Sequence, residues 1–495
     1  MYSPDAEAFA EMMEQAGLVP LHRTIVADLD TPLTIFAKVA EKEKHAFLFE
    51  SMEGGEKWGR YSFIGLDPLL SFSSVGDKVT LQKGGDEEFK EGVNPLQELR
   101  ELLASFNAST APGLPRFYGG AVGFLGYDMI RFIESIPDQH PPRDLPDSSF
   151  IVPRLVLIHD SVDQTLTVVC NMVPNKGEDA IDAAALYQEG CQRIEQIIEL
   201  IRSPLPTSLA AHAGGSPAHK FSSNMDEASF GKMVEQAKEY ILSGDIIQVV
   251  LSQRFHTKTE LDPFLLYRSL RHINPSPYLF YLRLDDVILI GSSPEILVRL
   301  EDDTIELRPI AGTRKRGATL QEDKELEEDL LADPKERAEH LMLVDLGRND
   351  VGRVAAGGTV TVGDLLVIEH YSHVMHIVSG VHGKLAEGKD QFDVLEACFP
   401  AGTVSGAPKI RAMEIIDELE PERRGPYAGA VGYFGFSGNM DFCITIRTFI
   451  MKDDDLWIQA GAGIVSDSVP EKEFEETVNK AQGLRRAVEL AEQGL

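Results

Sequence analysis

The sequence predicts an α+β fold built largely from antiparallel β-sheets. Segments with helical spacing and segments with strand-like spacing are mixed, without the regular strand–helix–strand order that produces a parallel sheet. The N-terminal part also contains a predicted β-hairpin, in which apolar runs at residues 46–51 and 59–65 flank a turn around Gly54 and Gly55. Because hairpins join antiparallel strands, both observations favour the same fold class.

The other expected elements follow in chain order. Apolar residues recur with helical spacing at residues 5–16 and 31–40, before the hairpin. Beyond it, short apolar runs between turn residues predict strands, and longer periodic runs predict helices. Strands are expected at residues 69–73, 78–82, 152–160, 165–170 and 304–307, and helices at residues 95–105 and 180–202.

Composition and charge narrow the class of protein. The chain has 495 residues, 43% hydrophobic and 25% charged, which is a globular composition and a length of roughly two to four domains. A formal net charge of -32 disfavours nucleic acid and anionic membranes as partners, because their phosphates would be repelled. No secretory leader or membrane-spanning run is recognisable, so a cytoplasmic protein is expected. The four cysteines lack CxxC spacing, which predicts neither disulfides nor a zinc site.

A stretch rich in Ser, Pro and Gly at residues 203–224 predicts a linker. It would separate an N-terminal unit, residues 1–202, from a C-terminal unit, residues 225–495. One repeat crosses this boundary, because residues 118–126 (YGGAVGFLG) resemble residues 427–435 (YAGAVGYFG). The glycine spacing does not fit a dinucleotide-binding motif, so both are interpreted as strands that allow close packing.

Residues 308–317 (RPIAGTRKRG) form a basic stretch between an expected strand and an acidic helical segment. Gly312 and Gly317 permit tight turns and close approach of a ligand, and Thr313 adds a hydroxyl. In an acidic chain, such a stretch suggests a site for a small anion. On this stretch alone, a solvated turn is the commoner explanation.

Two glutamate pairs are expected on helix faces. Proline precedes Glu336 and Glu339 at a predicted helix start, and Glu473 and Glu476 have the same three-residue spacing. Such pairs could hold a hard cation such as Mg²⁺, which takes one or two protein carboxylates together with water and substrate oxygens. Spacing alone favours two solvated acidic faces.

Three histidines, His370, His373 and His376, lie in a run expected to form one strand, residues 369–379. His370 and His376 would share one face and His373 the other, which argues against a three-histidine metal site. A single inward histidine remains a candidate acid or base. Glycine-rich stretches at residues 399–409 and 459–464 lack the P-loop pattern, but backbone amides there could receive a carboxylate.

Taken together, these segments resemble the chorismate-utilising enzyme family, most closely its branch of large, aminating anthranilate synthase subunits (component I). The resemblance covers about residues 24–486 and depends on several blocks in order. They are residues 244–254 (GDIIQVVLSQR), 274–278 (NPSPY), 292–297 (SSPEIL), 309–314 (PIAGTR), 339–350 (EHLMLVDLGRND) and 399–409 (FPAGTVSGAPK).

The resemblance implies two antiparallel sheets packed as a sandwich flanked by helices, with the active site in the C-terminal unit. It implies that Mg²⁺, held by Glu339 and Glu476 with Glu336 and Glu473 close by, binds the ring carboxylate of chorismate. The catalytic residues it implies are Glu295 as general acid for the leaving hydroxyl, His376 for the elimination of pyruvate, and Thr313. The implied substrate contacts are Gly312, Thr313, Tyr427, Arg447, Gly461, Ala462, Gly463 and Lys480.

Two positions separate the branches of this family. By the resemblance, aminodeoxychorismate synthases commonly have a nucleophilic lysine where this chain has Ala311, and isochorismate and salicylate enzymes have a water-activating lysine where it has Gln248. Neither residue can do that chemistry, so ammonia is the expected nucleophile. None of the four cysteines lies in a Gly-x-Cys-x-Gly glutaminase motif, so a separate glutamine amidotransferase subunit is expected in a hetero-oligomer.

The N-terminal hairpin resembles the family's tryptophan-feedback element, with LFES at residues 48–51 where relatives often have LLES. The resemblance implies conversion of chorismate and ammonia to anthranilate and pyruvate in tryptophan biosynthesis. Two alternatives remain open, namely an aminodeoxychorismate synthase and a non-catalytic tryptophan-binding regulator. The implied tryptophan site consists of Glu50, Ser51, Pro277, Tyr278 and Leu279.

Overall fold

The computed structural model describes all residues except 41–42, 53–58, 175–181, 207–218, 372–373 and 495. Helices and strands are mixed along the chain, and the named strands pair in antiparallel fashion, which confirms the predicted class. No helix in the described part is long and apolar enough to cross a membrane.

The strands form one hydrogen-bonded network with two arms that share β3 (Tyr61–Val75) and β7 (Ser148–Asp160). The first arm runs through β10 (Gln248–Lys258), β22 (Asp455–Ile464), β21 (Thr448–Lys452), β12 (Val287–Ser293), β11 (Tyr278–Leu284), β2 (His45–Glu50), β3, β7, β8 (Thr165–Met172) and β1 (Val19–Val26). The second arm runs through β5 (Asp86–Lys90), β4 (Lys78–Lys83), β3, β7, β6 (Gly120–Leu125), β19 (Ala430–Gly435), β20 (Met440–Ile444), β13 (Ile296–Glu301), β14 (Thr304–Leu307) and β17 (Val374–Lys384). Short additions are β9 (Ser222–Ser223) and β18 (Gly406–Ala407) on β10, and β15 (Ile310–Lys315) and β16 (Thr361–His370) on β17.

A shared apolar core lies between the arms. Phe47, Phe280 and Ile450 of the first arm and Val122 and Val431 of the second belong to one buried cluster. Because β3 and β7 are long enough to serve both arms, the strands are joined in one network and do not form two separate sheets.

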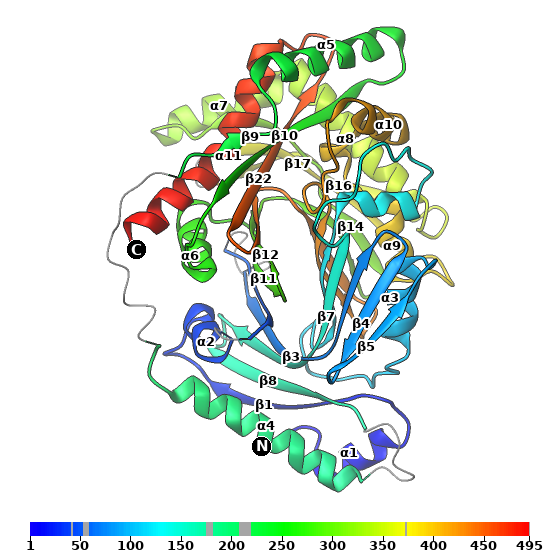
Figure 1. The fold of residues 1–495 in the computed structure, drawn as a ribbon, viewed down its shortest axis with the longest axis vertical. Coiled ribbons are helices and arrows are strands. Elements are labelled where there is room, and N and C mark those ends of the chain that lie inside the picture. Colours follow the sequence, from blue (N-terminus) through cyan, green and yellow to red (C-terminus); the bar gives the residue numbers. More distant parts are fainter. Residues whose placement is uncertain (41–42, 53–58, 175–181, 207–218, 372–373, 495) are drawn as a thin grey trace.

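Helices cover the outside of both arms (Figure 1). They are α1 (Ala6–Met13), α2 (Pro32–Val39), α3 (Pro95–Ala104), α4 (Ala183–Arg202), α5 (Glu227–Ser243), α6 (Pro263–Ile273), α7 (Leu320–Ala332), α8 (Pro334–Gly352), α9 (Gln391–Cys398), α10 (Lys409–Leu419) and α11 (Pro470–Gln493). Helix α4 lies along β1 and β8, and α11, red in Figure 1, runs beside β22. Helix α8 packs on β15 and β17, which places its glutamates at the second arm.

The expected N-terminal elements are present with slightly different ends, and one expectation is wrong. Residues 59–65 and 69–73 are predicted as two strands but form the single strand β3. Asp67 adopts φ +52°, and a register shift between Pro68 and Leu70 lets the strand continue past the proline. The predicted hairpin is confirmed by the pairing of β2 with β3, while its turn at Gly54 and Gly55 lies outside the described residues.

The two copies of the internal repeat lie side by side as β6 and β19. Gly123 is opposite Gly432, and a Cβ at these positions would lie 1.9 Å from the Ser149 carbonyl oxygen and 2.1 Å from that of Asp441. The predicted close packing is therefore confirmed. This pairing and that of β2 with β11 both cross the predicted domain boundary. The division at residues 203–224 stays a prediction, and residues 207–218 of that linker lie outside the described part.

Candidate active site

Two of the predicted site residues, Glu295 and Arg447, lie where the chain crosses between the arms. Glu295 lies between β12 of the first arm and β13 of the second, and Arg447 lies between β20 of the second and β21 of the first. The crossings are hydrogen-bonded to each other. The Ile444 amide donates to the Glu295 carbonyl at 3.0 Å, and the Ser292 amide donates to the Arg447 carbonyl at 3.1 Å. The topology therefore holds these two side chains in one region.

Glu295 has the protonation behaviour of a general acid. Burial raises its pKa to about 7, although a hydrogen bond from Thr403 and the charge of Lys480 lower it. The Thr403 hydroxyl donates to Oε1 at 2.8 Å from the short helix η4 (Gly402–Val404). A substantial protonated fraction therefore persists near neutral pH, as proton donation to a leaving group requires.

The glycine-rich end of β22 forms another part of the site. Lys480 of α11 donates to the Gly461 carbonyl at 2.9 Å and forms an ion pair with Glu476 at 2.8 Å. A Cβ at Gly461 would lie 2.7 Å from the Tyr427 hydroxyl, so only glycine fits there without displacing the tyrosine. Gly463 is similarly restricted, because a Cβ would lie 2.5 Å from the Gln248 amide nitrogen. The buried Ala462 lies between the two glycines.

His376 of β17 is directly opposite Thr313 of β15. Its Nδ1 lies 2.9 Å from the Gly312 carbonyl and 3.1 Å from the Thr313 hydroxyl. If Nδ1–H donates to that carbonyl, Nε2 of the neutral ring is an acceptor. Burial lowers the pKa of His376, and the positive charge of Arg447 lowers it further. The ring is therefore neutral near pH 7 and can accept a proton.

The histidine-containing run is a hairpin, so the prediction of one strand over residues 369–379 is wrong. β16 ends at His370 and β17 begins at Val374, with Glu369 opposite His376. No glycine or proline marks this turn in the sequence, which explains the error. His373 lies outside the described residues.

Arg447 is a cation without an anionic partner among the residues that the structure describes. Its guanidinium makes no ion pair or hydrogen bond within the described part of the chain, although its backbone is fixed in the left-handed region at φ +51°. Burial lowers its pKa, and the nearby Tyr427 only partly opposes this effect. A desolvated, unpaired guanidinium is unfavourable until an anion joins it. Its planar donor groups are suited to a carboxylate.

The arginines of the basic stretch differ from Arg447 because acidic residues already neutralise them. The suggestion that residues 308–317 offer positive charge to an anion is therefore wrong for these arginines, whereas Gly312 and Thr313 contact His376. The ion pairs are Arg308 with Glu369, Arg314 with Asp329, Asp333 and Glu336, and Arg316 with Asp323.

The four predicted metal ligands come from α8 and α11, each of which begins with a proline. Burial raises the pKa of Glu339, and the negative charges of Glu336 and Glu476 raise it further. Burial also raises the pKa of Glu473, with a further contribution from Glu476. The two helices thus bring together carboxylates that repel one another.

These carboxylates do not form a ready-made metal site. No group of three or more His, Cys, Asp and Glu side chains in the described ranges is placed to hold an ion, and Lys480 and Arg314 pair with Glu476 and Glu336. The donor chemistry nevertheless fits magnesium, because all four side chains offer hard oxygen ligands. A divalent cation would also remove the repulsion that raises the pKa of Glu339.

The five residues predicted for a second ligand line one cavity, and Glu295 is not among its lining residues. The cavity lies at the pairing of β2 with β11, where Glu50 is opposite Leu279. The Glu50 carboxylate accepts a hydrogen bond from the Tyr267 hydroxyl at 2.5 Å and forms an ion pair with Arg271 at 3.1 Å. A largely apolar cavity with a few polar groups suits a small aromatic ligand. Aromatic walls are contributed by Phe49, Tyr61, Phe63, Phe280 and Tyr433.

Comparison with known proteins identifies the family. The chorismate binding enzyme model matches residues 44–486. Anthranilate synthase component 1 of Aquifex aeolicus is 50% identical over 488 residues, which cover 98% of each chain. The chain belongs to the chorismate binding enzyme family, in its anthranilate synthase component 1 branch. The corresponding Thermus thermophilus protein is 46% identical and covers 96% of this chain and 99% of its own.

Solved structures of chorismate binding enzymes agree with the fold. Anthranilate synthase component I of Streptococcus pneumoniae is 38% identical, with a TM-score of 0.75 over 88% of this chain and 95% of its own. The isochorismate synthase MenF of Escherichia coli shares the fold at 20% identity, with a TM-score of 0.71 over 97% of this chain and 99% of its own.

Two contacts in this chorismate binding enzyme are not evident from the sequence. Thr403 lies in the glycine-rich block, but only the fold brings its hydroxyl to Glu295. Gln248 is recognisable as a branch-specific position, yet only the fold brings its side chain near enough to Glu339 to lower the pKa of that carboxyl. No local sequence pattern encodes either long-range contact.

Proposed function

We propose that this chain converts chorismate and ammonia into anthranilate, pyruvate and water. The observation that carries the proposal is that Glu295 and Arg447 lie together at the crossing between the arms, with Arg447 near enough to His376 of β17 to lower its pKa and without an anionic partner among the described residues. The full-length similarity to anthranilate synthase component 1 supports the choice of substrate. The proposal is tested by identifying the product, because an aminodeoxychorismate synthase would release an aminated compound that keeps its enolpyruvyl group.

Substrate binding would use both charged parts of the site. Arg447, with Tyr427 beside it, would bind one carboxylate, and the Tyr427 hydroxyl lies against Gly461. Glu339 and Glu476, with Glu336 and Glu473 close by, would hold Mg²⁺. That ion would supply the positive charge through which an acidic helix pair receives the ring carboxylate.

The first step adds ammonia at C2 of the ring while the C4–O bond breaks. Hydroxide is a poor leaving group, so Glu295 gives its proton to the departing oxygen, which leaves as water. In the second step, neutral His376 accepts the C2 proton. The C3–O bond then breaks, the ring becomes aromatic, and the released enolpyruvate takes up a proton to become pyruvate. Thr313 holds the imidazole in place from β15.

External ammonia is the proposed nucleophile. Ala311 and Gln248 cannot act as a nucleophile or activate water in the way a lysine could. The names of the relatives, component 1, imply a second component. We infer that this partner is a glutamine amidotransferase subunit that delivers ammonia within a hetero-oligomer.

We further infer that the two arms are the two layers of the family's sandwich, and that residues 1–202 and 225–495 form regulatory and catalytic units. The core shared by Phe47 and Val431 supports the first inference. The cavity lined by Glu50 and Pro277 supports the second inference, because its walls come from both units.

A ligand that bridges two units can bias their relative arrangement, and we propose that the ligand of this cavity is tryptophan acting as a feedback inhibitor.

Ser51→Phe is expected to relieve inhibition by tryptophan while leaving uninhibited activity nearly unchanged. The added ring would occupy the cavity, whose lining does not include Glu295, His376 or Arg447. The measurement is the tryptophan concentration that halves anthranilate formation, and we expect it to rise at least about tenfold, equivalent to about 1.4 kcal/mol of lost binding. The exposed Ser105→Phe serves as the matched control. Unchanged inhibition in Ser51→Phe would place the inhibitor elsewhere.

Arg447→Gln is expected to raise the KM for chorismate about 10- to 100-fold, because a hydrogen bond to a charged group contributes about 1.5–3 kcal/mol. Glutamine keeps some polarity but loses the charge. Steady-state kinetics with ammonium salt provide the test, with the exposed Arg486→Gln on α11 as control. An unchanged KM would mean that Arg447 does not bind the substrate.

A further inference from the structure

Arg424 is a fully buried arginine, with 1% of its surface exposed. It forms an ion pair with Glu420, whose side chain is 4% exposed, just beyond the end of α10. Glu420 also accepts hydrogen bonds from the amide and the hydroxyl of Ser252, each at 2.8 Å. Removing two charges from water is unfavourable, and a buried ion pair is weak evidence for stability. The other contacts of Arg424 suggest a role other than stabilising the fold.

Arg424 bonds directly to the loop behind the proposed general acid. Its Nη1 donates to the Val404 carbonyl at 2.7 Å. Val404 follows Thr403, whose hydroxyl donates to Glu295. A shift of the Val404 carbonyl would therefore move the hydrogen bond that lowers the pKa of Glu295.

The same guanidinium bonds to the strand beside the substrate glycines. Nη2 donates to the Val250 carbonyl at 2.7 Å, and Val250 of β10 is opposite Gly463 of β22. A planar guanidinium spreads its N–H groups over three nitrogens, so it can reach two carbonyls and a carboxylate that lie apart. A lysine offers its three donors from a single nitrogen and cannot span the same positions. Arg424 thus ties the Glu295 side of the site to the Gly463 side.

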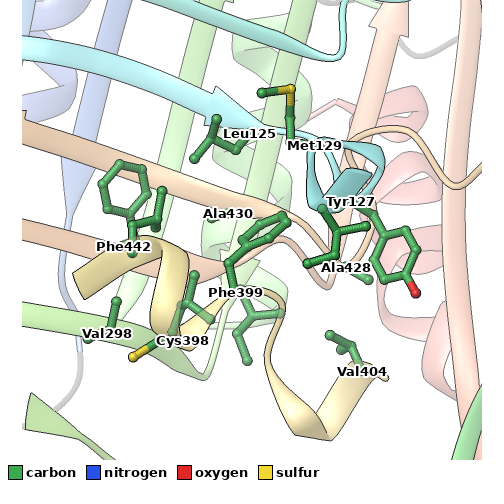
Figure 2. Close-up of a cluster of buried hydrophobic side chains, with 14 of the residues drawn as sticks. Leu125, Tyr127, Met129, Val298, Cys398, Phe399, Val404, Ala428, Ala430 and Phe442 are labelled. Atoms are coloured by element: carbon green, nitrogen blue, oxygen red, sulfur yellow. The ribbon is translucent and has the colours of Figure 1, made fainter. Parts of the chain in front are cut away.

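Arg424 also packs against two tyrosines. Its guanidinium carbon lies 5.6 Å from the ring centroid of Tyr427 and 4.7 Å from that of Tyr127, in short helix η2 (Tyr127–Phe132). The Tyr427 hydroxyl lies beside Gly461. Figure 2 shows Tyr127, Ala428 and Val404 in the apolar cluster that surrounds this region.

We propose that Arg424 is a positioning residue of the reaction, which fixes Tyr427 and the Thr403 loop relative to β10 and β22. It hydrogen-bonds the Val404 and Val250 carbonyls, on two elements that carry or flank site residues, and each of its three nitrogens donates to a protein acceptor. The inference rests on the proposed function, because the residues that it positions are the proposed substrate and proton-transfer groups.

Arg424→Lys tests this role, since lysine keeps the charge opposite Glu420 but cannot bridge both carbonyls. We expect kcat/KM for chorismate to fall about 10- to 100-fold, as small misplacements of reacting groups do. The high-pH limb of kcat/KM should also move to higher pH, because a loosened Thr403 bond no longer lowers the pKa of Glu295. Binding of tryptophan at the cavity lined by Glu50 and Pro277 is the check that the variant is folded.

Arg131→Lys is the matched control, because Arg131 is a largely buried arginine paired with Asp128 and Asp417 and touches no proposed site residue. It should lose thermal stability without a change in the pH profile. If Arg131→Lys lowers kcat/KM and moves the pH limb as Arg424→Lys does, the role of Arg424 is merely structural.

Non-additivity gives an independent test. In a variant that already carries Tyr427→Phe and Thr403→Val, the added Arg424→Lys change should lower kcat/KM by less than about threefold. The reason is that the groups that Arg424 positions are already absent. An equal loss in both backgrounds, or full activity of Arg424→Lys, would overturn the inference. If Arg424→Lys does not fold, the paired Arg424→Gln, Glu420→Gln variant removes both charges and carries the same expectations. A wild-type chain that does not consume chorismate would refute the proposed function instead.

Discussion

Glu339→Ala and Glu476→Ala are each expected to lower magnesium-dependent anthranilate formation at least about 10³-fold while leaving the fold intact. The reason is electrostatic. A bound cation contributes several kcal/mol of charge stabilisation, and each of these side chains is a proposed ligand. Glu339 is the more buried of the two, and burial raises its pKa first, with the negative charges of Glu336 and Glu476 adding to the effect.

Glu475→Ala is the matched control, because Glu475 is an exposed neighbour on α11. It should keep wild-type activity and magnesium dependence. Direct titration of magnesium by calorimetry gives a readout besides activity, and binding should weaken in the Glu339 and Glu476 variants only. Wild-type turnover or wild-type magnesium affinity in either variant would refute the metal assignment.

Glu295→Gln is expected to lower kcat by about 10²- to 10⁴-fold, the range typical of a lost general acid. In the wild type, kcat/KM for chorismate, referred to free ammonia, should fall as pH rises above about 7, because Glu295 then loses the proton that it donates. The residual activity of the Gln variant should lack this limb. A variant with wild-type activity, or with the same pH limb, would remove Glu295 from the mechanism.

The same substitution should stabilise the protein at alkaline pH. The folded-state pKa of Glu295, about 7, lies above its ordinary value of 4.5, so the native state binds the proton more tightly than the unfolded state. The free energy of unfolding therefore falls as pH rises from 4.5 through 7, by up to about 3 kcal/mol at about 1.4 kcal/mol per unit. Glutamine does not ionise, so the Glu295→Gln variant should not lose this part of the free energy of unfolding as pH rises. Urea unfolding without ligands at pH 4 and pH 8 measures the difference, with Glu475→Gln as control.

The fold class was predictable because it depends on local patterns. The proline at the start of α8 and apolar periodicity in the N-terminal half correctly indicate helices and strands. The errors occur where local rules are overridden. Pro68 does not end β3, because the register shift between Pro68 and Leu70 lets the strand continue past it. The residues between β16 and β17 include no glycine or proline, so the sequence gives no sign of a turn there.

The candidate site was predictable only in part, since its electrostatics depend on tertiary contacts. Spacing correctly places Glu339 and Glu476 on helices, but their mutual repulsion appears only when α8 and α11 meet. Arg314 and Arg447 are both arginines in the sequence, yet one is neutralised by three acids and the other has no such partner in the described structure. The crossing of the chain between the arms at Glu295 and Arg447 has no local signature at all.

The most direct measurement uses the purified chain alone with chorismate, an ammonium salt at mildly alkaline pH, and magnesium, and follows anthranilate fluorescence with and without tryptophan. The account predicts a fluorescence rise that requires magnesium and ammonia and that tryptophan suppresses. Chorismate consumption without anthranilate would contradict the proposed reaction in favour of an aminodeoxychorismate synthase. If chorismate is not consumed but tryptophan still binds, the result would contradict the enzymatic function and favour a non-catalytic tryptophan-binding regulator.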